Sequence, residues 1–118
     1  MPNIDTPMTE ALTRFLDINA FRHQLIVSNL ANIDTPGYRT RDIDFGRELE
    51  RATNEVEYAT FSPAPRQVQG LMERPDGNNV SVERESLLLA ETQMRFATGI
   101  QLLRAEFRRL AEAITEGK

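Results

Sequence analysis

A break in a helical pattern constrains this chain more than any other feature. The residues up to about Ile33 follow helical spacing, and the stretch Asn29–Tyr38 then ends that pattern with a Thr-Pro-Gly sequence. Pro36 lacks the amide that would continue a helix, and it disfavours the helical conformation in Thr35. Gly37 can adopt the positive φ that a type II turn needs at its third position. The sequence therefore predicts a helix that ends at a corner, after which the chain takes a new direction.

The first helix is expected to run from about Pro7 to Ile33, because Thr6 can cap its free amides and a proline suits the first helical position. Two neighbouring stripes give it a wide apolar face: Leu12, Leu16, Asn19, His23, Ile26, Leu30 and Ile33 in one, and Ala11, Phe15, Ile18 and Leu25 in the other. The first stripe contains two polar residues. Either they are tolerated positions on an ordinary core-facing helix, or Asn19 fixes the register of a multi-helix assembly.

The last part of the chain carries the clearest periodicity. Ser81 is expected to cap a helix with Glu83 and Glu85 in its first turn. Its apolar positions alternate at spacings of four and three, which is the pattern of a coiled-coil seam: Leu89, Gln93, Phe96, Ile100, Leu103, Phe107, Leu110 and Ile114. A flanking stripe is also small or apolar: Leu87, Ala90, Met94, Ala97 and Ala105.

These two helices predict the fold class, which is mainly α, with two long terminal helices that form a coiled-coil hairpin. An isolated hairpin is the simpler version. We favour a hairpin that also packs sideways against neighbouring copies, because the flanking stripe of the last helix would otherwise face water. Such a chain is expected to be poorly folded as a monomer, since its helices become ordered as they bury their seams.

The middle section, residues 39–79, is predicted to be extended and loop-like, between an N-terminal section (1–38) and a C-terminal section (80–118). Alternation in Arg39–Phe45 predicts a short extended segment with Ile43 and Phe45 on one face, followed by one or two helical turns up to Ala52. Prolines and a glycine in 58–75 predict loop with one or two short strands, and 76–79 predicts a turn.

Composition and charge argue against several classes of protein. The net charge of -4 disfavours nucleic acid as a partner, and the absence of cysteine excludes disulfides and thiolate chemistry. No secretory signal peptide is recognisable in residues 1–5, and no apolar run approaches the roughly 18 residues that span a membrane.

The sequence offers no catalytic, cofactor-binding or metal-binding set, so an enzyme is not expected. The single histidine, His23, lies inside the first helix, and no glycine-rich phosphate loop is present. Asp42 and Asp44 alternate on the extended segment and are expected on the surface. The turn at 76–79 lacks the ligand spacing of a calcium loop.

The corner resembles the signature of the rod, hook and hook-junction proteins of the bacterial flagellum. Nine residues carry the resemblance: Ser28, Asn29, Leu30, Ala31, Asn32, Thr35, Pro36, Gly37 and Tyr38. The continuation from Tyr38 to Phe45 and the entry to the last helix, 76–85, are similar to the small proximal-rod class of FlgB type. Ser81 stands where that class commonly has aspartate, and serine keeps a helix cap.

The resemblance implies a structural subunit of the periplasmic proximal rod that polymerises through its terminal helices into the helical drive-shaft tube of the basal body. It implies export by the flagellar type III apparatus without a cleaved signal peptide. The implied partners are copies of itself, other rod subunits, the rod-adaptor protein and the export gate, with no nucleic acid, lipid-spanning segment or cofactor. The alternatives are a standalone helical hairpin that binds a partner and a secretion-associated chaperone.

Overall fold

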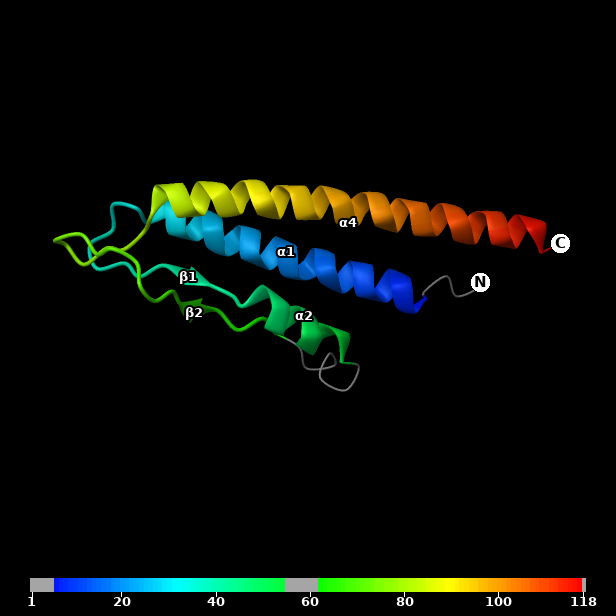
Figure 1. The fold of residues 1–118 in the computed structure, drawn as a ribbon, viewed down its shortest axis with the longest axis horizontal. Coiled ribbons are helices and arrows are strands. Elements are labelled where there is room, and N and C mark those ends of the chain that lie inside the picture. Colours follow the sequence, from blue (N-terminus) through cyan, green and yellow to red (C-terminus); the bar gives the residue numbers. More distant parts are fainter. Residues whose placement is uncertain (1–5, 55–61, 118) are drawn as a thin grey trace.

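The structure is an antiparallel pair of long helices with a thin second layer beneath it (Figure 1). The computed structural model describes residues 6–54 and 62–117. The described elements, in chain order, are α1 (Pro7–Ala31), β1 (Arg41–Asp42), α2 (Phe45–Thr53), β2 (Arg66–Gln67) and α4 (Val82–Glu116). The molecule measures 68 × 28 × 21 Å. The predicted fold class, mainly α with two long terminal helices, is confirmed.

Local signals fix both ends of α1. The Thr6 hydroxyl accepts a hydrogen bond from the Thr9 amide at 3.1 Å, and the Thr9 hydroxyl accepts one from the Thr6 amide at 2.7 Å, so the two threonines form a reciprocal cap. The helix ends at Ala31 and not at Ile33, because the Asn32 amide already closes the last turn on the carbonyls of Ser28 and Asn29. The prediction of the helix was correct and its end was two residues too late.

The two apolar stripes of α1 contact different layers, except that Phe15 of the second stripe lies against both Phe45 and Gly99. Ile18 and Leu25 of the second stripe form a core cluster with Ile43 and with Ala52 of α2. The first stripe turns Leu16 towards α4. Packing on both sides therefore explains the wide apolar face of α1 within a single chain, which places α1 between α4 and the α2 layer (Figure 1).

The middle section forms the second layer. Strands β1 and β2 pair antiparallel, with Arg41 opposite Gln67. The extended segment is shorter than predicted: Asp44 caps α2, and Phe45 is the first residue of that helix and not a strand residue. The Phe45 ring meets Phe15 edge-on at 5.7 Å. The helical turns expected up to Ala52 are confirmed. In the predicted loop, residues 58–61 lie outside the described residues, and the remainder contains β2.

The face of α4 that meets α1 is small and polar. Its buried residues, Glu85, Thr92 and Gly99, recur every seven positions. A Cβ on Gly99 would lie 2.7 Å from a terminal carbon of Leu16 and 3.2 Å from the Phe15 ring, so glycine allows the two helices to approach closely here.

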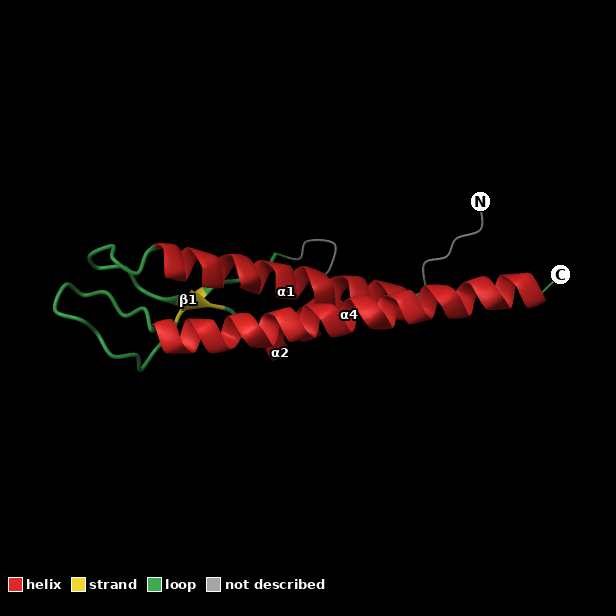
Figure 2. Ribbon diagram, turned by 90° about the horizontal axis from the view of Figure 1, so that it is seen from above, coloured by secondary structure: helices red, strands yellow, loops and turns green. Residues whose placement is uncertain are grey.

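The two long helices differ in length, with 25 residues in α1 and 35 in α4. The contact of Gly99 with Phe15 fixes their register, in which Pro7 lies opposite Phe107. The end of α4 therefore extends beyond α1 by about 13 Å, at 1.5 Å per residue (Figure 2). We call residues 107–116 the C-terminal overhang.

Replacing Gly99 with leucine should separate the helices and lower stability. Overpacking costs about 1–3 kcal/mol, and the gain in helix propensity over glycine offsets about 1 kcal/mol of it. Ala105→Leu, on an exposed side of the same helix, is the matched control. Urea unfolding followed by circular dichroism, with a stabilising osmolyte present, compares the two midpoints. An equal midpoint for both variants would contradict the close approach.

Candidate assembly site at the corner and the helix pair

The corner is a turn, as predicted, and its geometry is that of type II. The Tyr38 amide donates to the Thr35 carbonyl at 3.2 Å, and Gly37 at the third position has a φ of 74°. A second turn lies against it, because the Gly37 amide donates to the Asp76 carbonyl at 2.9 Å. Gly77 in that turn has a φ of 87°, and a Cβ there would lie 3.4 Å from the Gly37 Cα. Two glycines thus let the two turns pack against each other.

Asn78 closes the end of α1. Its side-chain amide donates to the carbonyls of Asn32, Ile33 and Thr35 at 2.9, 3.0 and 2.9 Å. Its carbonyl oxygen accepts the Val80 amide at 2.8 Å. This fully buried side chain therefore holds together the turn that follows α1, because it bonds to three carbonyls of that turn. The sequence predicted a turn at this position but did not indicate this function, because the bonded carbonyls are more than 40 residues away.

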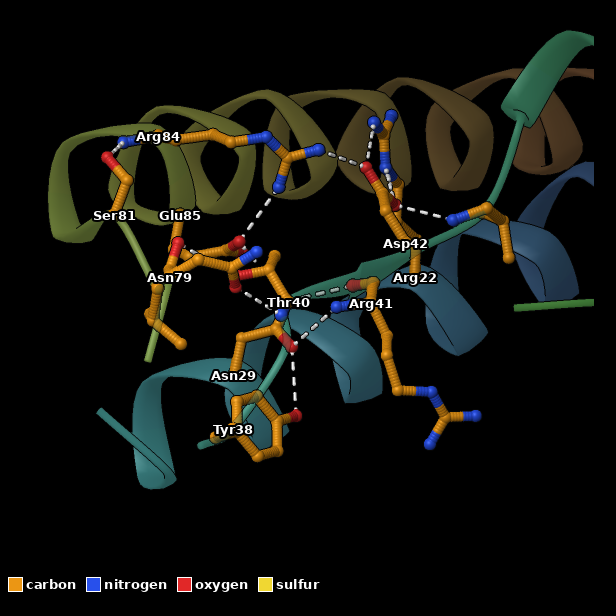
Figure 3. A network of polar contacts seen from close by, with 12 residues as sticks. Arg22, Asn29, Tyr38, Thr40, Arg41, Asp42, Asn79, Ser81, Arg84 and Glu85 are labelled. Carbon is orange, nitrogen blue, oxygen red and sulfur yellow. Dashed lines mark hydrogen bonds and ion pairs between the residues drawn. The ribbon is translucent and has the colours of Figure 1, made fainter. Parts of the chain in front are cut away.

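Asn29 joins three segments beneath the corner (Figure 3). Its amide nitrogen donates to the Arg41 carbonyl at 2.8 Å and to Glu85 Oε1 at 3.2 Å. Its oxygen accepts the Tyr38 hydroxyl at 3.0 Å and the Arg41 amide at 3.2 Å. One side chain from α1 is thus bonded to the corner, to β1 and to α4.

The remaining residues of the signature lie around this contact. The Asn32 side chain donates to the Ser28 carbonyl at 2.8 Å and accepts the Thr35 hydroxyl at 3.0 Å. Leu30 is half-buried, whereas the outer edge of the corner is exposed and consists of Ser28, Ala31, Thr35, Pro36 and Gly37. The signature therefore has an inner part that fixes the turn and an outer part that faces solvent.

The Asp42 carboxylate is the centre of an ion-pair cluster, so its predicted surface position was wrong. Arg22 donates to both of its oxygens at 3.0 Å, and Arg84 donates at 2.7 Å. In Figure 3 the Asp42 side chain, at the end of β1, points towards Arg22 and Arg84. Asp44 instead caps α2. Burial alone would raise the pKa of Asp42, but the bonds from Arg22 and from the Ile43 amide outweigh burial and lower it.

Glu85 has the opposite electrostatics in the same cluster. It is fully buried; its Oε1 accepts from Asn29 and from Arg84, and its Oε2 has no partner among residues 6–54 and 62–117. Burial raises the pKa of Glu85, against the hydrogen bonds from Asn29 and Arg84, and the nearby Asp42 charge also raises it. The sequence indicated only a first-turn acid at this position.

The predicted seam lies beside the face of α4 that meets α1. Leu89, Ile100, Leu103 and Leu110 are half-buried, and the exposed members are Gln93, Phe96, Phe107 and Ile114. The hairpin itself uses the neighbouring positions Glu85, Thr92 and Gly99. The assembly role of the seam stays a prediction.

The ion-pair cluster around Asp42 and Glu85 holds the helix ends together, because most of its donors and acceptors bond other members of the cluster. His23, the single histidine of the sequence, is exposed on α1. Within the described part of the chain, no group of three or more acidic or histidine side chains could hold a metal ion. The same residues contain no helix that is both long and apolar enough to cross a membrane.

A long helix pair joined through the Asn29–Tyr38 corner is the arrangement expected of a flagellar axial protein. Comparison with curated proteins identifies the family. FlgB, a flagellar basal body rod protein of Cereibacter sphaeroides, is 38% identical over 106 residues, which cover 79% of this chain and 82% of that protein. The chain belongs to the FlgB family of flagellar basal body rod proteins.

Relatives of lower sequence identity carry the same name. The FlgB proteins of Salmonella typhimurium and Aeromonas hydrophila are each 29% identical, over 122 and 113 residues. The matches cover 86% and 84% of this chain, and 88% and 86% of those proteins. No family model matches the chain. The predicted resemblance to the proximal-rod FlgB type is confirmed, and the chain is a structural subunit of the flagellar basal body rod.

Removing the Asn29 side chain should destabilise the fold far more than removing the side chain of Ser28. Asn29→Ala removes one of the two donors to the buried Glu85 and the side-chain partner of the Arg41 carbonyl and amide, which costs roughly 2–3 kcal/mol. Ser28→Ala loses one exposed contact, the 3.3 Å approach to the Tyr38 hydroxyl, and is the control. Urea midpoints measure the difference, and equal midpoints would show that Asn29 does not hold the corner.

The two buried carboxylates should affect stability with opposite dependence on pH. The pKa of Asp42 is lowered in the fold, so its charge stabilises the fold at neutral pH, and this contribution is lost as the pH falls through the folded value. The pKa of Glu85 is raised, so its buried charge costs stability at neutral pH until protonation relieves that cost.

Glu85→Gln should therefore gain stability relative to the unmodified chain at about pH 7, and the gain should shrink towards about pH 5. Asp42→Asn should lose stability at about pH 7, because it removes the buried negative charge that Arg22 and Arg84 share. Urea unfolding across this range tests both. All other carboxylates are common to the three proteins, so a pH-independent difference between Glu85→Gln and the unmodified chain would rule out the raised pKa.

Proposed function

We propose that this rod subunit polymerises through its terminal helices into the helical tube of the proximal rod. The observation that carries the proposal is the number of large apolar side chains that α4 exposes on two of its sides. Among the described residues, seven of the ten exposed large hydrophobic side chains lie on this helix: Val82, Leu87, Met94, Phe96, Leu102, Phe107 and Ile114. Apolar surface of this extent marks an interaction site, because an isolated protein would leave it in water.

The interior of the chain supports the same proposal. In the described part, seven hydrophobic residues are buried, against ten that are polar or charged. Hydrophobic burial is the main favourable term in folding, so a small apolar core gives a single copy little stability. Burial of α4 against neighbouring copies supplies the hydrophobic stabilisation that the small core does not provide. Ordering of the helices is then coupled to assembly, which supports the expectation of a poorly folded monomer.

The rest of the proposal follows from family membership. The terminal helices form the inner layer of the tube, and the middle section, residues 39–79, lies outside it. The chain reaches the periplasm through the flagellar type III apparatus without a cleaved signal peptide. Its neighbours are copies of itself, other rod subunits, the rod-adaptor protein and the export gate, and its role is mechanical and not catalytic.

Charged replacements on the seam should abolish motility and leave expression unchanged. Phe96 and Phe107 are 40% and 42% exposed, so glutamate at either position is tolerated by the chain itself and is unfavourable in a buried contact between subunits. Complementation of a strain that lacks the gene, scored by swimming in soft agar and by immunoblot, measures the effect.

Met72→Glu is the matched control, because Met72 is 91% exposed in the middle section. It makes the same change from a large apolar residue to glutamate outside the helix pair. Normal swimming with Phe96→Glu and Phe107→Glu would contradict assembly through the seam. A stable, monodisperse monomer or dimer in size-exclusion chromatography would instead favour a standalone hairpin or a chaperone.

A further inference from the structure

A groove of about 430 Å³ lies between the two long helices. Its α1 side consists of Asn19, Ala20, His23 and Gln24, and its α4 side of Thr92, Gln93, Phe96 and Ala97. The α1 side is mostly polar, and the α4 side ends in the apolar pair Phe96 and Ala97. Two seam residues, Gln93 and Phe96, lie in this groove, so the seam runs along its edge before it reaches the overhang.

An unsatisfied acceptor lies at the groove. The Asn19 side chain is fully buried, and its amide nitrogen donates to the Phe15 carbonyl at 2.9 Å. Its oxygen has no hydrogen-bond partner among the residues that the structure describes. A buried acceptor without a partner costs free energy, so the groove favours an occupant that brings a donor. Asp17, two turns before Gln24 on the same side of α1, adds an exposed acidic charge.

The C-terminal overhang of α4 has the complementary pattern. Phe107, at its start, is half-exposed. Arg104 and Arg108, at spacings of three and one from Phe107, fall on one flank of that ring. Neither arginine has an ion pair with any residue in 6–54 or 62–117. On the other flank of the ring lie Leu110 and Ile114, so the helix end has one basic flank and one apolar flank.

We propose that the C-terminal overhang of one copy docks in the α1–α4 groove of a second copy. Phe107 fills the groove beside Phe96, and the apolar flank lies along the α4 side. The basic flank lies along the α1 side, where Arg108 faces Asp17 and an arginine donor reaches the Asn19 oxygen. This is recognition of an amphipathic helix by a groove, with orientation set by charge.

A second copy is the occupant because the same seam supplies both halves of the contact. The first half of the seam borders the groove. The second half continues past the end of α1 onto the overhang. In this docking the two copies are parallel, and Phe107 of one lies at the level of residue 95 of the other. The copies are therefore displaced by twelve residues, or about 18 Å along the helix axis. This inference rests on the proposed polymerisation and specifies one of its contacts.

A photo-crosslinker in place of Phe107 tests the docking. p-Benzoylphenylalanine keeps the aromatic ring and attaches to whatever surrounds it. The purified chain carrying it is concentrated until it sediments as an assembly, irradiated and digested for mass spectrometry. We expect a covalent dimer in which position 107 is attached to a peptide that contains residues 17–24 or 92–97 of a second copy. The same crosslinker at position 105, on the opposite side of the helix, should not attach to these peptides.

Charge reversal provides an independent arm. Asp17→Arg and Arg108→Asp should each lower the yield of covalent dimer severalfold, and the double variant should restore it, because the pair is re-formed with its charges exchanged. Far-UV circular dichroism confirms that each variant keeps its helices. Failure of the double variant to restore the dimer would overturn the assignment of Asp17.

The outcomes separate this inference from the proposed function. Assemblies that sediment but are attached elsewhere would overturn the docking and leave polymerisation intact. Attachment in living cells to a different rod protein, and not to a second copy, would overturn the choice of occupant. The absence of any covalent dimer, together with normal swimming of Phe107→Glu, would overturn both.

Discussion

The whole arrangement depends on how the turn after α1 is held in place. The amide of Asn78 bonds to three carbonyls of that turn, those of Asn32, Ile33 and Thr35. Because Asn78 follows the middle section, this contact fixes where that section returns. Its own carbonyl then accepts the Val80 amide, one residue before the Ser81 cap of α4. One buried side chain thus fixes the turn after the first long helix and positions the start of the second.

The polar cluster beneath the corner sets geometry, and apolar contacts elsewhere supply stability. Asn29, Asp42 and Glu85 are buried, and each makes bonds to groups from more than one segment. Such directional bonds are satisfied in one arrangement only, so a helix slipped by one turn would leave charges without partners. The chain therefore has polar residues where the helices meet each other and apolar residues where α4 faces outward.

Sequence patterns predicted the features that local chemistry decides. Both helix caps, the type II turn at Gly37 and the two long helices needed only neighbouring residues. The burial of Asp42 could not be predicted, because it depends on Arg84, 42 positions away. The periodicity of α4 indicated an apolar stripe but not its partner. Gly99 carries no apolar side chain to mark it, yet it lets α1 pack on the adjacent, more polar stripe.

The difference in length between the two long helices has a mechanical consequence. Where α1 and α4 run together, bending either helix strains the contacts between them, so the pair is stiffer than one helix. The last ten residues of α4 lack this brace from the described part of α1. The folded subunit therefore has a stiff shaft with a compliant tip. A tube that transmits torque must stiffen every tip through its neighbours, so its rigidity is a property of the assembly and not of the subunit.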